Sequence, residues 1–463
     1  MRKFVSHPHY SKNTVTETFR TDKEFKLPRP NQCPNDFNSA KTVIKEFLIP
    51  LKKFDVCPND CMIYHNDIEK TCDACGSERY DANGKPKKVF KYFPLGPRLA
   101  RIFQDENLAK ILHAHSTRTD KDVLSDILDT YRWRKEWFDL GGEFKGQYGC
   151  ALNFCTDGVN PFKTVGIQYS MWPMMMSVLN FPVSFRKSVG GTLLLGIIPG
   201  NGRKEAYHLD PYISIVVNEL IILSDCHIYY PQYMSSPLEV KVKLLQYVLD
   251  FPGIAKLMKQ PGSGGIKACP WCDVKGRYSK VLKKTVYLDS QRYLKEDHAL
   301  KTNEDFGKRS SESDEPNALS VEEEKTLRTQ YDELKSEYRK KEFSKRFGVK
   351  GSYALMKLPY HQYHKHIQPD GMHTIKDVLE HVIDWLSGNI HQVKLNESEK
   401  ELRMGEHESY EQPKALTEDE KIRGNNRCQQ LKFPYGCSAF KGDIFGNHKR
   451  VLKKTHGWTE VSS

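Results

Sequence analysis

The chain has 463 residues, of which 38% are hydrophobic and 28% are charged. Its 22 Phe, 23 Tyr and 6 Trp supply enough apolar side-chain surface for a packed core, which excludes wholesale disorder. Lys and Arg outnumber Asp and Glu by 71 to 59, and the net charge of +12 favours a polyanionic partner such as nucleic acid, although solubility alone explains it equally well.

The apolar runs are all too short for a membrane span, which needs about 20 residues. The first residues are basic but lack the apolar centre of a secretory signal. We therefore expect a soluble intracellular protein of two to four domains, in which the 12 Cys are thiols or metal ligands rather than disulfides.

The N-terminal third alternates between polar, cysteine-rich and basic segments. Apolar residues at helical spacing predict a helix over 40–51, and a second helical stretch covers 105–140. Between them lie a cysteine-rich segment over 57–76 and a basic, aromatic segment over 85–103.

Strand patterns dominate after residue 142. Strands are predicted over 147–154, 192–198 and 239–249, and an Asp-Pro start predicts a helix over 210–223. A charged helix over 320–347 reads as an insertion, whereas 372–386 has the apolar stripe of an amphipathic helix.

Two close cysteine pairs form the most specific local motif. Cys57 and Cys61 are followed ten residues later by Cys72 and Cys75. Two such pairs can converge on one tetrahedral Zn²⁺, which would fold a small module that cannot otherwise bury a core. The alternative is chance clustering of buried thiols.

A run of basic residues without acidic interruption follows this motif. It consists of Lys85, Lys87, Lys88, Lys91, Arg98 and Arg101. With the aromatic residues among them, these side chains suit contact with a nucleic-acid backbone. A solvated face of an ordinary element is the competing interpretation.

Two aspartates stand where predicted strands end. Asp157 follows the first strand and Asp250 follows the third. Carboxylates at strand ends can hold Mg²⁺ for phosphoryl transfer, although an Asp in such a place is more often a turn or cap residue.

A second Cys-x2-Cys motif, Cys269 and Cys272, lacks a nearby cysteine pair. His366 and His373 are the natural candidates to complete a zinc site with it. A redox role is the alternative, but the surrounding sequence has no thioredoxin-like pattern.

Taken in order, these motifs resemble the transposases of CACTA (En/Spm) DNA transposons over about residues 50–385. The similarity is carried by the segments CPNDC, CDACG, PKKVFKYFPLGPRL, FCTDGVNPF, YSMWP, LLGIIPG, YVLDFPG, KACPWC and HIQPDGMH. The resemblance implies an RNase H-like fold and an Asp-Asp-Glu triad that uses two divalent ions, Mg²⁺ or Mn²⁺, to cut and join DNA.

Carried over by residue, the resemblance makes Asp157 and Asp250 the first two acids of the triad. It assigns Cys57, Cys61, Cys72 and Cys75 to an N-terminal zinc knuckle, and Cys269 and Cys272 to a zinc-stabilised insertion. It further implies a nuclear protein whose partners are transposon terminal repeats and target DNA, with possible self-association.

The sequence departs from the family pattern at the third acid. In the family, the catalytic Glu and a His pair lie well downstream of the segment that matches HIQPDGMH, and this chain ends before them. Asp370 and Glu380 are possible substitutes. Two alternatives follow: an enzyme that needs a partner or a longer form, and an inactive, truncated or domesticated DNA-binding protein.

We therefore expect an α/β protein with an RNase H-like mixed-sheet core, an N-terminal zinc knuckle and a charged helical insertion. The expected divisions are 1–50 (polar and helical), 51–104 (knuckle and basic segment), 105–145 (helical linker), 146–275 (catalytic core), 276–350 (insertion) and 351–463 (C-terminal helical region).

Overall fold

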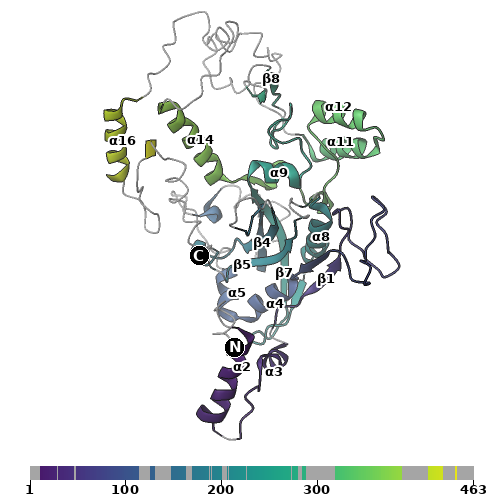
Figure 1. The fold of residues 1–463 in the computed structure, drawn as a ribbon, viewed down its shortest axis with the longest axis vertical. Helices are drawn as coiled ribbons and strands as arrows, with labels where there is room; N and C mark the ends of the chain where they lie inside the picture. The colour runs from purple at the N-terminus through teal and green to yellow at the C-terminus, as the bar shows by residue number, and fades with distance from the viewer. Residues whose placement is uncertain are drawn as a thin grey trace, which may run out of the picture.

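The computed structural model shows a mixed α/β protein built around one large sheet (Figure 1). It describes residues 11–28, 30–45, 48–113, 126–130, 148–162, 169–186, 188, 190–200, 206, 208–225, 227–272, 274–279, 284–287, 319–387, 416–430 and 444–445.

The sheet has eight strands, and strand pairing changes from antiparallel to parallel at the central strand β3. The strands run in the order β1-β2-β5-β4-β3-β7-β10, with β6 paired to β7. Their bounds are β1 (Lys52–Asp55), β2 (Val89–Tyr92), β3 (Tyr148–Thr156), β4 (Trp172–Val178), β5 (Thr192–Ile198), β6 (His227–Tyr229), β7 (Leu238–Leu249) and β10 (Ile367–Pro369). β3, β4 and β5 are antiparallel neighbours, whereas β3, β7 and β10 are parallel. Parallel neighbours bring their carboxyl ends to the same edge of a sheet.

The predicted strands over 147–154, 192–198 and 239–249 correspond to β3, β5 and β7. β4 was not predicted from the sequence, although its side chains alternate strictly between buried and half-buried. Its methionine-rich sequence lacks the polar residues that usually reveal alternation.

Helix α8 (Asp210–Ser224) packs against β7 and lies within the main core. The apolar residues of α8 lie on most sides of the helix and do not form a single stripe, because other parts of the protein cover most of its surface. Helices α4 (Gly96–Gln104) and α5 (Glu106–His113) add Leu99, Phe103 and Leu112 to the same core. The rest of the predicted helical stretch over 105–140 contains the turn η4 (Ile127–Asp129) and otherwise lies outside the described residues.

The cysteine-rich segment is continuous with the sheet. It leaves the sheet after β1 and returns at β2, which pairs with β5 through Tyr92 and Gly196. A Cβ atom at Gly196 would lie 2.6 Å from the Phe90 ring, so this crossing requires glycine. The knuckle is therefore fixed to the edge strand of the core.

The N-terminal segment forms a separate small cluster of Val15, Phe19 and Ala40. Its elements are α2 (Lys12–Thr21), the turn η1 (Asp22–Lys26) and α3 (Phe37–Val43). The Asp36 side chain accepts a hydrogen bond from the Ser39 N–H at 2.8 Å and so caps the start of α3. The predicted helix over 40–51 therefore begins too late, and α3 also ends earlier than predicted, at Val43.

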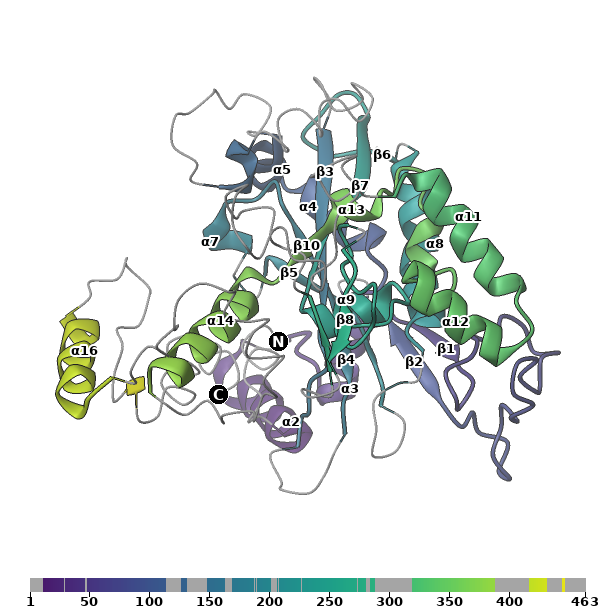
Figure 2. The same ribbon diagram turned by 90° about the horizontal axis from the view of Figure 1, so that it is seen from above.

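The charged segment forms two helices where the sequence predicts one. α11 (Val321–Glu333) and α12 (Glu337–Phe347) form a hairpin on the α8 side of the molecule (Figure 2). The hairpin is anchored in the core, because Arg328 is only 1% exposed and donates to the Met258 and Gly351 carbonyls.

Shorter elements complete the fold. These are α7 (Val183–Arg186), α9 (Phe251–Leu257), β8 (Arg277–Ser279), β9 (Lys284–Val286), η8 (Ala354–Lys357), α13 (Tyr363–His366), α14 (Gly371–Leu386) and α16 (Glu418–Gln430). Of the helices in the described ranges, none combines the length and apolar character needed to cross a membrane.

Candidate functional site

Three aspartates follow the carboxyl ends of three neighbouring parallel strands. Asp157 follows β3, Asp250 follows β7 and Asp370 follows β10. The register pairs Cys155 with Val248, and the Asp370 N–H donates to the Leu249 carbonyl at 3.0 Å. The sheet thus brings to one edge three acids that are far apart in the sequence.

Local hydrogen bonds fix each of these carboxylates. Asp157 Oδ1 accepts the Gly158 N–H at 2.6 Å, and Asp250 Oδ1 accepts the Gly253 N–H at 2.7 Å as the cap of α9. Asp370 Oδ2 lies 2.7 Å from Nδ1 of His373. Asp250 is therefore a helix cap, as the alternative interpretation of this residue predicted. Capping uses Oδ1 alone, so Oδ2 can still interact with other groups.

The three carboxylates and one imidazole act on one another electrostatically. Burial and then the charge of Asp250 raise the pKa of Asp157, with a smaller contribution from Asp370. The hydrogen bond to Asp370 raises the pKa of His373, and the charges of Asp250 and Asp157 add to this effect. Repulsion among the carboxylates is what a bound cation would relieve.

The donor set at this edge fits a hard divalent ion. Carboxylate oxygens suit Mg²⁺ and Mn²⁺, and Mg²⁺ keeps several of its waters while using one or two carboxylates. Among the described residues, the only tight group of potential metal ligands is formed by the four cysteine sulfurs described next. The carboxylate oxygens at this edge of the sheet lie farther apart than those sulfurs do. An ion that retains waters is suited to that wider spacing.

The four predicted knuckle cysteines converge. One sulfur from each of Cys57, Cys61, Cys72 and Cys75 lies within 4.8 Å of the others. Hydrogen bonds from Ser77 and Asn59 lower the pKa of Cys75 to about 5, whereas burial raises the pKa of Cys61. Four such sulfurs can hold a metal ion such as zinc in tetrahedral geometry.

A buried ion pair joins the knuckle to the core. Asp60 is fully buried between two of the cysteines, in the left-handed conformation with φ of 59°. Its carboxylate lies 2.5 Å from Lys88 Nζ and accepts a hydrogen bond from the Tyr212 hydroxyl of α8. The sequence gives no signal for this link beyond an Asp inside a turn.

The structure divides the basic run into internal and exposed members. Arg98 is buried and donates to the carbonyls of Pro94, Leu194 and Phe93, while Lys88 faces Asp60. The exposed members are Lys85, Lys87, Lys91 and Arg101. Spacing in the sequence could not reveal that two of the six cations hold the protein together.

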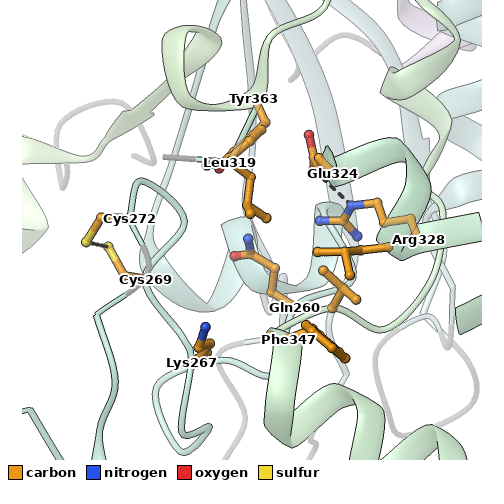
Figure 3. A pocket seen from close by; sticks show the side chains of 12 residues that line it. Gln260, Lys267, Cys269, Cys272, Leu319, Glu324, Arg328, Phe347 and Tyr363 are labelled. Carbon is orange, nitrogen blue, oxygen red and sulfur yellow. Dashed lines mark hydrogen bonds and ion pairs between the residues drawn. The ribbon is translucent and has the colours of Figure 1, made fainter. Parts of the chain in front are cut away.

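The second cysteine pair lines a small cavity of about 70 Å³. The sulfurs of Cys269 and Cys272 lie 3.4 Å apart, opposite the Glu324–Arg328 ion pair (Figure 3).

The two histidines predicted to join this pair have other partners. His366 Nδ1 contacts the Gln362 backbone at 2.8 Å, and His373 contacts Asp370. Among the described residues these four side chains do not form a compact ligand group. A zinc ion bound by all four stays a prediction from the resemblance.

Residues 122–330 match the model of the transposase family tnp2. The match supports a transposase family. No curated protein matches the chain. The matched segment of this transposase-like chain includes Asp157, Asp250, Cys269 and Cys272, and it ends within α11, before β10 and Asp370.

Proposed function

We propose that this chain is a DDE-type transposase of the CACTA kind, which cuts and joins DNA strands at transposon ends with divalent metal ions. The observation that carries the proposal is the position of Asp157 and Asp250 at the ends of adjacent parallel strands, inside the segment that matches a transposase family. Carboxylates are the side chains that hold Mg²⁺ in phosphoryl-transfer sites.

The strand order supports an RNase H-like core. Three antiparallel strands (β3, β4 and β5) are followed by α8 and then by β7, which is parallel to β3. The central order β5-β4-β3-β7-β10 is the order that an RNase H-like sheet has. β1 and β2 extend this sheet at the β5 edge.

In this mechanism Asp157 and Asp250 would hold the divalent ion. Their backbone-bound Oδ1 atoms fix both carboxylates before any substrate arrives. The ion, when bound, lowers the pKa of the attacking water or 3′-hydroxyl and stabilises the departing oxygen. Gly158 and Gly253 therefore help to position the proposed metal ligands, because their backbone N–H groups fix the orientation of the two carboxylates.

Exposed cations of the knuckle region position DNA without reading its sequence. Lys85, Lys87, Lys91 and Arg101 have the exposure that phosphate contacts require, whereas Lys88 and Arg98 serve the fold. A zinc ion at Cys57, Cys61, Cys72 and Cys75 has a structural role. Nuclear location and self-association belong to the same proposal.

The test is Mn²⁺-dependent nicking of DNA that carries the terminal repeats of the element. Asp157→Asn and Asp250→Asn each remove a metal ligand worth several kcal/mol of transition-state stabilisation, so we expect nicking to fall by about 100-fold or more. Asp377→Asn, an exposed acid on α14, is the matched control and should cut normally.

Two results would overturn the proposal. One is full nicking by Asp157→Asn. The other is salt-sensitive DNA binding by the wild-type protein without any cleavage, which would indicate an inactive DNA-binding protein.

A further inference from the structure

Strand β10 places one more acid beside the proposed metal ligands. β10 pairs in parallel with β7, with Pro369 opposite Leu249. The next residue on each strand is an aspartate, and the Asp370 N–H bonds to the Leu249 carbonyl at 3.0 Å. The backbone of Asp370 is therefore held next to that of Asp250 by the sheet itself.

His373 fixes the Asp370 side chain. Its ring Nδ1 lies 2.7 Å from Asp370 Oδ2, and its backbone N–H donates to Oδ1 at 3.2 Å. Thr374 N–H and hydroxyl both donate to the Asp370 carbonyl at 3.0 Å. The first turn of α14 thus clamps this aspartate in one orientation.

The other candidate acid is held elsewhere. Glu380 lies nine residues beyond the start of α14, which corresponds to roughly 14 Å along a helix axis. Its carboxylate pairs with Lys376 at 3.2 Å. The structure thus separates Glu380 from the strand ends and keeps Asp370 with them.

We propose that Asp370 is the third carboxylate ligand of the divalent ion and that His373 is the positioning residue that holds it. This assignment rests on the proposed function and adds a third carboxylate to Asp157 and Asp250. The ion is Mg²⁺ or Mn²⁺, shared with Asp157 and Asp250.

Helix capping is the competing explanation for Asp370, and it can be separated from metal binding. Asn caps a helix about as well as Asp. Asp370→Asn therefore keeps the cap and the fold but removes the anionic oxygen that an ion needs.

The experiment measures Mn²⁺ binding to the full chain without DNA, by titration calorimetry and by the electron paramagnetic resonance of free Mn²⁺. We expect Asp157→Asn and Asp370→Asn each to weaken Mn²⁺ affinity by about tenfold or more, and Glu380→Gln to leave it unchanged. His373→Ala should also weaken binding, whereas His373→Asn retains a donor near Nδ1 and should restore most of it. Thermal unfolding of metal-free Asp370→Asn should match that of the wild type.

The outcomes separate the two proposals. If Asp157→Asn loses Mn²⁺ binding and Asp370→Asn does not, Asp370 is only a cap and the assignment fails while the proposed function stands. If the wild type has no Mn²⁺ site sensitive to Asp157, the proposed function itself fails.

A second readout is independent of affinity. When Fe²⁺ occupies the Mg²⁺ site, added hydrogen peroxide oxidises it to Fe³⁺ and is itself split into hydroxide and a hydroxyl radical, which cuts the nearby backbone. Cuts are expected close to Asp157, Asp250 and Asp370, and the absence of cuts at the end of β10 would overturn the assignment.

Discussion

The four knuckle sulfurs are not chemically equivalent. Cys75 is exposed, its Sγ lies within hydrogen-bond distance of the Ser77 hydroxyl at 3.3 Å, and it accepts a hydrogen bond from the Asn59 amide at 3.5 Å. Cys61 has no such help, and burial raises its pKa. Cys75 is therefore more readily ionised than Cys61, because the pKa of Cys75 is lowered and that of Cys61 is raised.

We expect Cys75 to be the most reactive thiol of the metal-free protein. Because its pKa is lowered to about 5, its thiolate is present at neutral pH and is lost as the pH falls through about 5. Iodoacetamide labelling followed by peptide mass mapping should find Cys75 modified first, and zinc should block the reaction. Cys155, whose pKa burial raises to about 11, is the internal control. Earlier labelling of Cys61 would contradict this order.

At the scale of elements, the knuckle and α8 are joined by Asp60, Lys88 and Tyr212. The Lys88 side chain is only 10% exposed, so removal of the Asp60 charge would leave a nearly buried cation unpaired. Breaking such a pair from one side costs about 3–5 kcal/mol, whereas replacing both partners is often nearly neutral.

We therefore expect Asp60→Asn to lower the free energy of unfolding by about 3 kcal/mol. Asn tolerates the left-handed backbone at this position, so the variant tests the charge and not the turn. The double variant Asp60→Asn with Lys88→Met should recover more than half of the loss in urea unfolding. No recovery would mean that the Tyr212 hydrogen bond, and not the ion pair, carries the link.

Sequence patterns predicted most of the long elements but missed β4 and the very short strand β10. β5 and α8 are bounded by Gly, Pro or Asp and are largely apolar, and β7 begins with apolar residues that alternate with charged ones, so the positions of these elements could be predicted. β10 has three residues, too few for any periodicity, and its place is set by pairing with a distant strand. The position of Asp370 beside Asp250 therefore depends on tertiary pairing and had no local signal.

The same limit explains the basic run. The sequence showed six cations with no acid between them, but it could not show that three carbonyls surround Arg98 or that a buried carboxylate faces Lys88. In contrast, the cysteine quartet was predicted in full, because metal-ligand spacing is local.

At the scale of the whole molecule, the knuckle is an extension of the main sheet with its own source of stability. β2 contacts β5 through the Tyr92–Gly196 pairing and a Phe93 N–H bond to Leu195 at 2.7 Å. Structural zinc stabilises small modules by about 10–16 kcal/mol. The main core around β7 and α8 is built from apolar contacts, and the four cysteine sulfurs lie outside it in a separate small cluster.

Removal of zinc should therefore loosen one edge of the sheet. We expect chelation to speed amide hydrogen exchange in β1 and β2 by at least about tenfold, because a metal bound by the four cysteines would hold together the segment that connects these two strands. Exchange in β7 and α8 should stay slow, as measured by mass spectrometry with and without chelator. Equal acceleration in β7 would show that the metal supports the whole domain.

The parallel pairing of β7 with β10 has a consequence during synthesis. The partner of Tyr247 is Ile367, so the ribosome needs on the order of 10 s to make the intervening chain. During that time a nascent polypeptide carries two of the proposed ligands and an uncovered strand edge. On the assignment of Asp370, the third proposed ligand would join the site only after β10 has been synthesised and has paired with β7.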